Sequence, residues 1–293
     1  MKRLKCNENF EVVIVNDGSQ DETDALLKNY IYEEKNFSIK VISIKNSGRS
    51  YARNTGIRFS KGNLIIFSDD DLILDPRFLS FHSTMHKSND KLVVHGQILS
   101  LPYLKFFKNP TSGELYDGGF AKNQLMDKII TSEMFSNGKI QRYLKNNAKM
   151  SKFEKDIMTL FECTSIHDSY VRWIGFTGGN VSILRSNISY DEMFDINMGR
   201  KWGCEDLEMG YRLYKKGLSF IYCKQARSYH INHYRDNHMD IHNNSLQYFI
   251  EKHNDELIEL LKKYFNGSYS SLVDWKKDRD ILVCKNEPIE WME

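Results

Sequence analysis

The sequence contains no apolar run close to the ~20 residues that a transmembrane helix needs, and its first residues lack the apolar stretch of a signal peptide. It also has little excess charge, because 41 basic residues are scattered among 39 acidic ones for a net charge of +2. This balance argues against nucleic-acid binding, which needs a basic surface. We therefore expect a globular protein without a transmembrane segment, and peripheral contact with a membrane stays open.

Cysteine is scarce, and its spacing excludes two classes of protein. The five cysteines are far apart and form no CxxC pair: Cys6, Cys163, Cys204, Cys223 and Cys284. Such a set is typical neither of a disulfide framework nor of a zinc site. We interpret these residues as small buried side chains of a protein in the reducing cytoplasm, where the inner face of the membrane is also accessible.

Residues 11–71 alternate between two patterns. Short β-branched runs predict strands at 11–15, 38–44 and 63–67, and helices are predicted at 22–32 and 47–59. A β-α-β-α-β order indicates a parallel sheet covered by helices, so we expect an α/β fold. Asp75 and Pro76 then predict the N-cap and first position of another helix, followed by a strand at 91–99.

The pattern is weaker between residues 103 and 170, which we interpret as an insertion over one face of the sheet, with an amphipathic helix at 152–161. Later elements are predicted as a strand at 180–184, a helix at 205–216 ended by Gly217, short strands at 219–223 and 226–230, and a helix at 244–265.

These elements suggest one domain with an appendage. We expect a domain at 1–235, made of a nucleotide-binding half (1–100), the insertion (103–170) and an acceptor-side half (175–235). A C-terminal helical extension would follow at 236–293.

Two acidic turns follow predicted strands: Asp17 follows the first, and Asp69-Asp70-Asp71 follows the third. Ligands of open α/β sheets bind at the carboxyl ends of the strands. Three adjacent carboxylates repel one another unless a cation offsets them, and oxygen ligands suit Mg²⁺ or Mn²⁺. The alternative is a solvated loop that caps the next helix, but Asp75 already supplies that cap.

A second acidic pair, Glu205 and Asp206, opens the helix predicted at 205–216, close to Trp202. The helix dipole alone favours acidic residues in a first turn. The functional interpretation is a general base that takes a proton from a hydroxyl group, beside an aromatic ring on which a sugar can stack.

Three further residues are candidates for the same site. His230 and His233 follow a predicted strand, and imidazole nitrogen can complete a Mn²⁺ shell begun by carboxylates. Arg53 lies on a helix that should start near the sheet edge. There it could pair with Asp17, contact a nucleotide base, or be an exposed helix residue.

Taken together, these segments resemble the inverting family 2 glycosyltransferases of GT-A fold, and in particular their chondroitin-polymerase-like members. Residues 11–21 are similar to the family's first nucleotide-binding turn, 48–56 to its Gly-x-x-x-Ala-Arg-Asn-x-Gly helix, and 67–71 to its DxD motif. Residues 178–182 and 202–212 are similar to its acceptor-side half. The resemblance covers about residues 10–100 and 175–233.

The resemblance implies roles that spacing alone does not assign. It implies that Asp17, Arg53, Asn54, Asp69 and Asp70 bind the nucleotide, and that Asp71, with Asp69 and His230, holds Mn²⁺ or Mg²⁺. It also implies that Asp206 is the base and Glu205 holds the acceptor, with Trp202, Gly178, Gly179 and Asn180 lining the sugar site.

One departure from the family pattern bears on the fold. The family's domain opens with a strand that ends in Pro-x-Tyr-Asn, followed by a helix, and that strand is central and contacts the nucleotide. Only ten residues precede Glu11, and residues 1–6 are similar to the end of that helix. We therefore expect this chain to lack the first strand and helix.

The resulting expectation is a metal-dependent, inverting transferase that moves a sugar from a nucleoside-diphosphate donor, a UDP-sugar first of all, to a hydroxyl of a glycan or glycoconjugate in polysaccharide synthesis. Two alternatives stay open. One is a non-catalytic nucleotide-sugar or glycan-binding module, which the absent strand favours. The other is a sugar nucleotidyltransferase, although the glycine-rich, lysine-containing loop usual near the start of such enzymes is not seen.

Overall fold

The computed structural model describes residues 3–33, 37–109, 114–115, 129–162, 170–198, 203–233 and 238–278. Its first elements are β1 (Glu11–Asn16), α1 (Thr23–Glu33), β2 (Ser38–Ser43), α2 (Arg49–Phe59) and β3 (Leu64–Ser68). The predicted β-α-β-α-β order is confirmed, with each boundary within two residues of its expected place.

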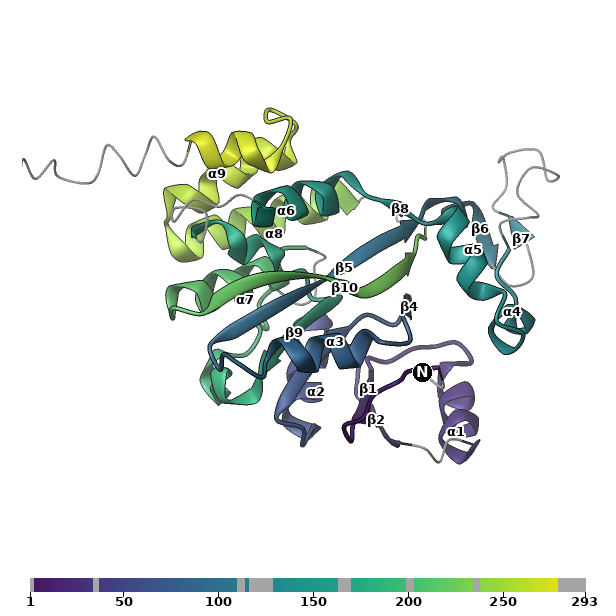
Figure 1. Cartoon of the computed structure of the whole chain (residues 1–293). Helices are drawn as coiled ribbons and strands as arrows, with labels where there is room; N and C mark the ends of the chain where they lie inside the picture. The colour runs from purple at the N-terminus through teal and green to yellow at the C-terminus, as the bar shows by residue number, and fades with distance from the viewer. Residues whose placement is uncertain are drawn as a thin grey trace, which may run out of the picture.

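The strands form two main sheets (Figure 1). β1 and β2 pair in parallel as a sheet of their own. The larger sheet has the order β3-β9-β5-β10-β4, with the short β8 also paired to β5. Its strands are β4 (Leu72–Leu74), β5 (Leu92–Leu101), β8 (Lys149–Met150), β9 (Asn180–Leu184) and β10 (Ser219–Ile231). β5 and β10 are parallel, whereas β9, β4 and β8 run antiparallel to their neighbours.

Helices cover both faces of the large sheet. On one face α3 (Phe78–Met85) packs against Leu92 and Val94 of β5 through Phe81 and Met85. Val93, which lies between these two residues on β5, faces the opposite side of the sheet, into the main core. That core is completed by α6 (Lys152–Glu162), α7 (Glu205–Lys215), α8 (His238–His253) and α9 (Glu256–Phe265).

The first part of the predicted insertion packs at the far end of β5 and β10, over side chains of one sheet face such as Leu99 and Tyr229. It contains η1 (Pro102–Phe106), β6 (Phe107–Asn109), β7 (Glu114–Leu115), α4 (Ser132–Ser136) and α5 (Ile140–Asn147). Ile140 and Leu144 of α5 share a small core with Leu101 and Tyr229. Only α6, which matches the helix predicted at 152–161, joins the main core. Among the described residues that follow it are three short 3₁₀ helices: η5 (Arg172–Gly175), η6 (Arg185–Asn187) and η7 (Tyr190–Glu192).

Three local predictions were wrong. The two strands expected at 219–223 and 226–230 are one strand, β10, because a register shift between Cys223 and Ser228 lets the chain stay paired with β5. The helix expected at 244–265 is two helices, because the backbone turns at Asn254 (φ 46°) and Asp255 caps α9. Asp75 is not the N-cap of α3, which begins at Phe78; its carboxylate instead accepts the N–H of Arg77.

Two further expectations concern glycines and membrane spans. Gly217 ends α7 with φ 81°, as predicted for a residue just past a helix C-terminus. Within the described ranges, no helix is both long and apolar enough to span a bilayer.

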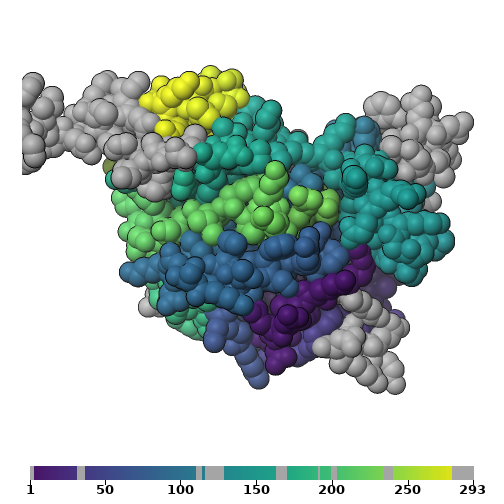
Figure 2. All heavy atoms as spheres, in the orientation of Figure 1, coloured from purple at the N-terminus to yellow at the C-terminus, as the bar shows by residue number. Residues whose placement is uncertain are grey.

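The unit formed by β1, α1 and β2 is weakly buried. Among the described residues before Ile57, no hydrophobic side chain is fully buried, and Leu26 of α1 is 63% exposed. Figure 1 shows this unit at one corner of the molecule, and Figure 2 shows the N-terminal residues on the surface beside the α3 region. A hydrogen bond from the backbone N–H of Lys5 to the carbonyl of Pro76 fixes that contact.

We expect this weak burial to appear in hydrogen exchange. Amides of β1 and β2 should exchange at least ~10-fold faster than those of β5 and β9, because opening the small sheet exposes little apolar surface. Mass spectrometry of peptic peptides over time would measure both. Equal protection in the two sheets would contradict a separate, weakly held unit.

Candidate active site

Arg53 of α2 joins the two acidic segments that the sequence singled out. Nη2 of its guanidinium donates to Oδ1 of Asp69 at 3.1 Å, and Nη1 donates to Oε1 of Glu205 at 3.0 Å. The central carbon of the guanidinium, Cζ, lies 5.3 Å from the centre of the Phe194 ring. Burial acts to lower the pKa of Arg53, but Asp69 and Glu205 outweigh it and raise that pKa above its usual value. The acidic turn after β3 and the start of α7 therefore meet across one permanent cation.

Glu205 is held on all sides at the start of α7. Its side chain is 3% exposed, and besides Arg53 it accepts the backbone N–H of Gly203 and lies 3.8 Å from the guanidinium of Arg49. These donors hold the carboxylate in one orientation. Such a group is suited to positioning a neighbour or an acceptor hydroxyl.

Asp206 has a different environment from Glu205, although the two are adjacent. It is half-buried, and its one hydrogen bond given by the structure is from the N–H of Leu207, at 2.9 Å. Burial, and then the negative charge of Glu205, raise the pKa of Asp206 to about 7, although Arg53 acts in the opposite direction. A carboxyl with a pKa near neutrality is suited to accepting a proton at physiological pH.

Asp71 lies beside two histidines from the end of β10. Its Oδ2 is 3.1 Å from Nε2 of His230 and 3.5 Å from Nδ1 of His233. The antiparallel pairing of β4 and β10 explains the contact, because it sets His230 opposite Leu72, the residue after Asp71. One ligand atom from each of these three residues lies within 4.8 Å of the others.

This donor set fits a divalent cation. One carboxylate and two imidazoles suit Mn²⁺ better than Mg²⁺, which prefers oxygen ligands throughout. Asp69 is outside this cluster, since its carboxylate accepts from Arg53. Asp70 is an exposed residue, but the protein around its carboxyl partly excludes water, which raises its pKa. The negative charges of Asp71 and Asp69 raise the pKa further, as expected for crowded acidic groups.

Two residues predicted to bind nucleotide are engaged by the protein itself. The carboxylate of Asp17 accepts the backbone N–H groups of Ser47 and Gly48 at 2.7 and 2.8 Å, and so fixes the turn that precedes α2. It does not pair with Arg53 in the structure. Asn54 is buried, and its amide exchanges two hydrogen bonds with the backbone of Phe194. Asn54 thereby holds the Phe194 ring against Arg53.

The predicted sugar-site segment 178–180 lies against the same arginine. Gly178 has φ 67°, and a Cβ there would be 2.8 Å from Arg53 Nη2, so a side chain does not fit without a shift. A Cβ on Gly179 would be 3.1 Å from Asp69. Asn180 is fully buried instead: its amide donates to Ala226 and accepts from His82, tying β9 to its neighbours. Burial lowers the pKa of His82 to about 4, so this ring is neutral.

The structure adds Phe194 to the candidates and places His233, already a candidate from the sequence, beside Asp71. The His233 ring lies 3.5 Å from the Asp71 carboxylate, compared with 3.1 Å for His230. Phe194 contacts Arg53 but lies in a segment without a readable motif. Trp202, predicted to stack on a sugar, lies outside the described residues.

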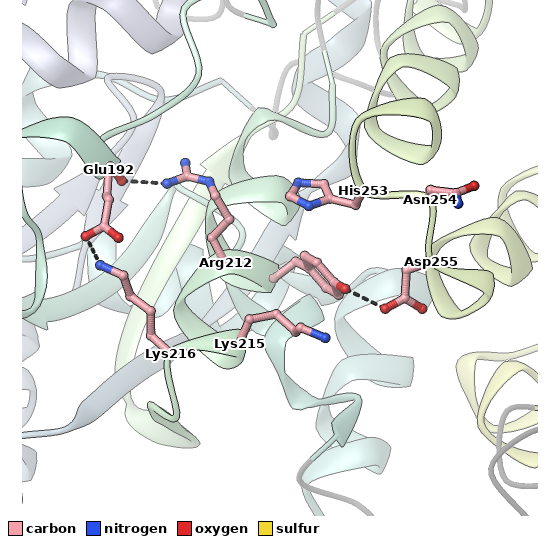
Figure 3. A pocket seen from close by; sticks show the side chains of 8 residues that line it. Glu192, Arg212, Lys215, Lys216, His253, Asn254 and Asp255 are labelled. Carbon is pink, nitrogen blue, oxygen red and sulfur yellow. Dashed lines mark hydrogen bonds and ion pairs between the residues drawn. The ribbon is translucent and has the colours of Figure 1, made fainter. Parts of the chain in front are cut away.

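A surface pocket lies at the opposite end of α7 from Glu205 and Asp206 (Figure 3). It is lined by Glu192, Tyr211, Arg212, Lys215, Lys216, His253, Asn254 and Asp255. None of the predicted site residues is among these side chains. This pocket is therefore a separate feature at the junction of α7 with the C-terminal helices.

The relatives found among curated proteins are named as glycosyltransferases or as hyaluronan and chondroitin synthases. The chain is 27% identical over 289 residues to an uncharacterised glycosyltransferase of Bacillus subtilis, YfnE, covering 92% of this chain and 69% of that protein. It is 25% identical over 234 residues to chondroitin synthase of Escherichia coli and over 231 residues to hyaluronan synthase of Pasteurella multocida. These matches cover 77% of this chain but only 31% and 22% of the two synthases.

Comparison with solved structures supports the fold. Residues 1–349 of S. aureus TarS, solved in complex with UDP, superpose with a TM-score of 0.52 at 15% identity, over 92% of this chain and 66% of that one. This likeness confirms the expected GT-A-type architecture of a sheet flanked by helices. The family described as "Glycosyl transferase family 2" matches residues 2–148, half of the chain. The chain therefore belongs to glycosyl transferase family 2.

Proposed function

We propose that this protein transfers a sugar from a nucleoside-diphosphate donor to a hydroxyl group of a glycan or glycoconjugate, with inversion at the sugar's reactive carbon. The observation that carries the proposal is the Arg53 bridge, which brings the Asp69–Asp71 turn and the Glu205–Asp206 pair to one place. In this proposal residues 1–100 bind the nucleotide and 175–235 bind the acceptor. The names of the related synthases support a role in polysaccharide synthesis.

Asp71, His230 and His233 would hold the cation, and Mn²⁺ fits these ligands best. When bound there, a divalent cation supplies the positive charge that a departing diphosphate needs. Asp206 removes the proton from the acceptor hydroxyl, while Glu205, held by Arg53, positions the acceptor. A single displacement then inverts the configuration, with the proton transferred to an Asp206 oxygen.

Donor binding should depend on the metal. UDP should stabilise the protein against thermal unfolding when Mn²⁺ is present and much less with EDTA, whereas GDP should have little effect. The UDP complex of TarS supports testing this nucleotide first. Asp71→Ala should abolish the Mn²⁺-dependent part, because it removes the charged ligand of the cluster.

The measurement is calorimetric titration of UDP with and without Mn²⁺. His230→Ala and His233→Ala should each weaken Mn²⁺-dependent binding by at least ~10-fold, and Asp90→Ala, an exposed carboxylate elsewhere, should leave it unchanged. Equal binding by Asp71→Ala and the unmodified protein would remove the metal from the proposal.

Turnover should depend on Asp206. Asp206→Asn keeps the shape of the side chain but cannot take a proton, so kcat should fall by at least ~10²-fold while UDP affinity persists. Transfer assayed with the donor chosen by the titration would measure it, with exposed Glu259→Gln on α9 as the control. An unchanged kcat would show that Asp206 is not the base.

The pH dependence of kcat/KM, which reports groups of the free protein, provides a separate test. Only ionised Asp206 accepts a proton, so kcat/KM should rise with pH to a plateau with a midpoint near 7, the pKa of this carboxyl. Glu205→Gln removes a negative charge that raises this pKa, and the midpoint should move to lower pH. A midpoint that stays in place in Glu205→Gln would contradict the assignment.

A further inference from the structure

The turn that presents Glu205 and Asp206 has an unusual backbone. Both residues before α7 lie in the left-handed region, with φ 111° at Gly203 and φ 64° at Cys204. Glycine adopts this region freely, but a residue with a side chain does so only at a cost in free energy. Cys204 is also the N-cap of α7 and makes no side-chain capping bond. Contacts from outside the turn must therefore hold it.

His242 of α8 supplies these contacts. A Cβ on Gly203 would lie 2.7 Å from Cδ2 of His242, so the glycine allows the imidazole to pack directly on the backbone. The Sγ of Cys204 lies 3.6 Å from Nε2 of the same ring. Cys204 and His242 are 2% and 8% exposed, and the far side of the ring meets Phe265 of α9 edge-on, with ring centres 4.5 Å apart.

A second contact fixes α8 along α7. Glu208, one turn into α7, is fully buried and accepts from Lys252 at 2.8 Å and from His253 at 2.9 Å, both at the end of α8. Burial would raise the pKa of Glu208, but these donors and Arg212 lower it to about 2, so the Glu208 carboxyl stays ionised. Arg212 and His253 also line the surface pocket at the C-terminal end of α7 (Figure 3). Glu208 thus holds the end of α8 against α7, while His242 of α8 packs on the turn that precedes α7.

We infer that His242 is a positioning residue for the reaction, because it holds the Gly203–Cys204 turn in the conformation that orients Glu205 and Asp206. The inference rests on the proposed function, since it gives His242 a purpose through Asp206. The inference gives the C-terminal helix α8 a role in the reaction, through the position of His242. The sequence offered no motif for this helix.

The test compares His242→Ala with Leu160→Ala, which removes a fully buried side chain from α6, away from the turn. His242→Ala should lower kcat by ~10-fold or more, as expected when a reacting group is misplaced, and leave UDP–Mn²⁺ affinity within ~2-fold. Leu160→Ala should lower the melting temperature at least as much but keep kcat within ~2-fold, with both assayed well below melting. His242→Phe, which keeps a ring at this position, should restore most of the lost kcat.

A second readout is independent of turnover. Burial raises the pKa of the Cys204 thiol, so alkylation by iodoacetamide should be slow in the unmodified protein and in Leu160→Ala. It should be faster in His242→Ala, as followed by mass spectrometry of the Cys204 peptide. An unchanged kcat in His242→Ala, or an equal loss in Leu160→Ala, would overturn the inference. If Asp206→Asn keeps full turnover, Asp206 is not the base, and if the unmodified protein transfers no sugar, the proposed function fails. In both cases the alkylation rates still report whether His242 holds the turn.

Discussion

The arrangement of this site depends on one buried guanidinium. The acidic residues Asp69, Asp70, Asp71, Glu205 and Asp206 gather in one region, where their charges repel one another. Arg53 takes one carboxylate from each acidic segment, and the absence of a side chain at Gly178 makes room for it. Asn54 holds the backbone of Phe194, and the Phe194 ring packs against the Arg53 guanidinium. Asp71 lies beside two histidines, and Asp206 lies in the first turn of α7.

The weakly buried β1-α1-β2 unit has a bearing on this site, because the loop after β1 carries Asp17. That carboxylate joins the unit to α2 through the backbone of Ser47 and Gly48, and α2 carries Arg53. In the described part of the chain, the small sheet is not hydrogen-bonded to the large one. α2 is then the main link between the two sheets, with Gly56 against Val15 on one side and Ile57 in the core on the other.

Local patterns in the sequence were enough to predict elements whose signals are local. β-branched runs predicted β1, β2 and β3, and the acidic turn after β3 predicted Asp71 as a candidate ligand. Signals that depend on tertiary packing were not available. The unbroken pairing of β10 with β5 across residues 223–228 is decided by the neighbouring strand, and the break at Asn254 by the packing of α9. Asn54 and Asn180 resembled ligand-binding residues, but their amides hold backbone groups within the protein. His242 became informative only when its distance to Gly203 was known.

The adjacent acids Glu205 and Asp206 show how position decides chemistry. Glu205 is buried beside Arg53 and Arg49 and accepts the backbone N–H of Gly203, so its orientation is fixed. Asp206, one residue further along the helix, accepts the N–H of Leu207, and burial, followed by the charge of Glu205, raises its pKa to about 7. Successive residues of an α-helix differ by about 100° around its axis, so the conformation of the turn before α7 decides which of the two side chains faces Arg53. In our proposal the left-handed turn at Gly203 and Cys204 fixes that orientation, and the C-terminal helix α8 acts on the site through it.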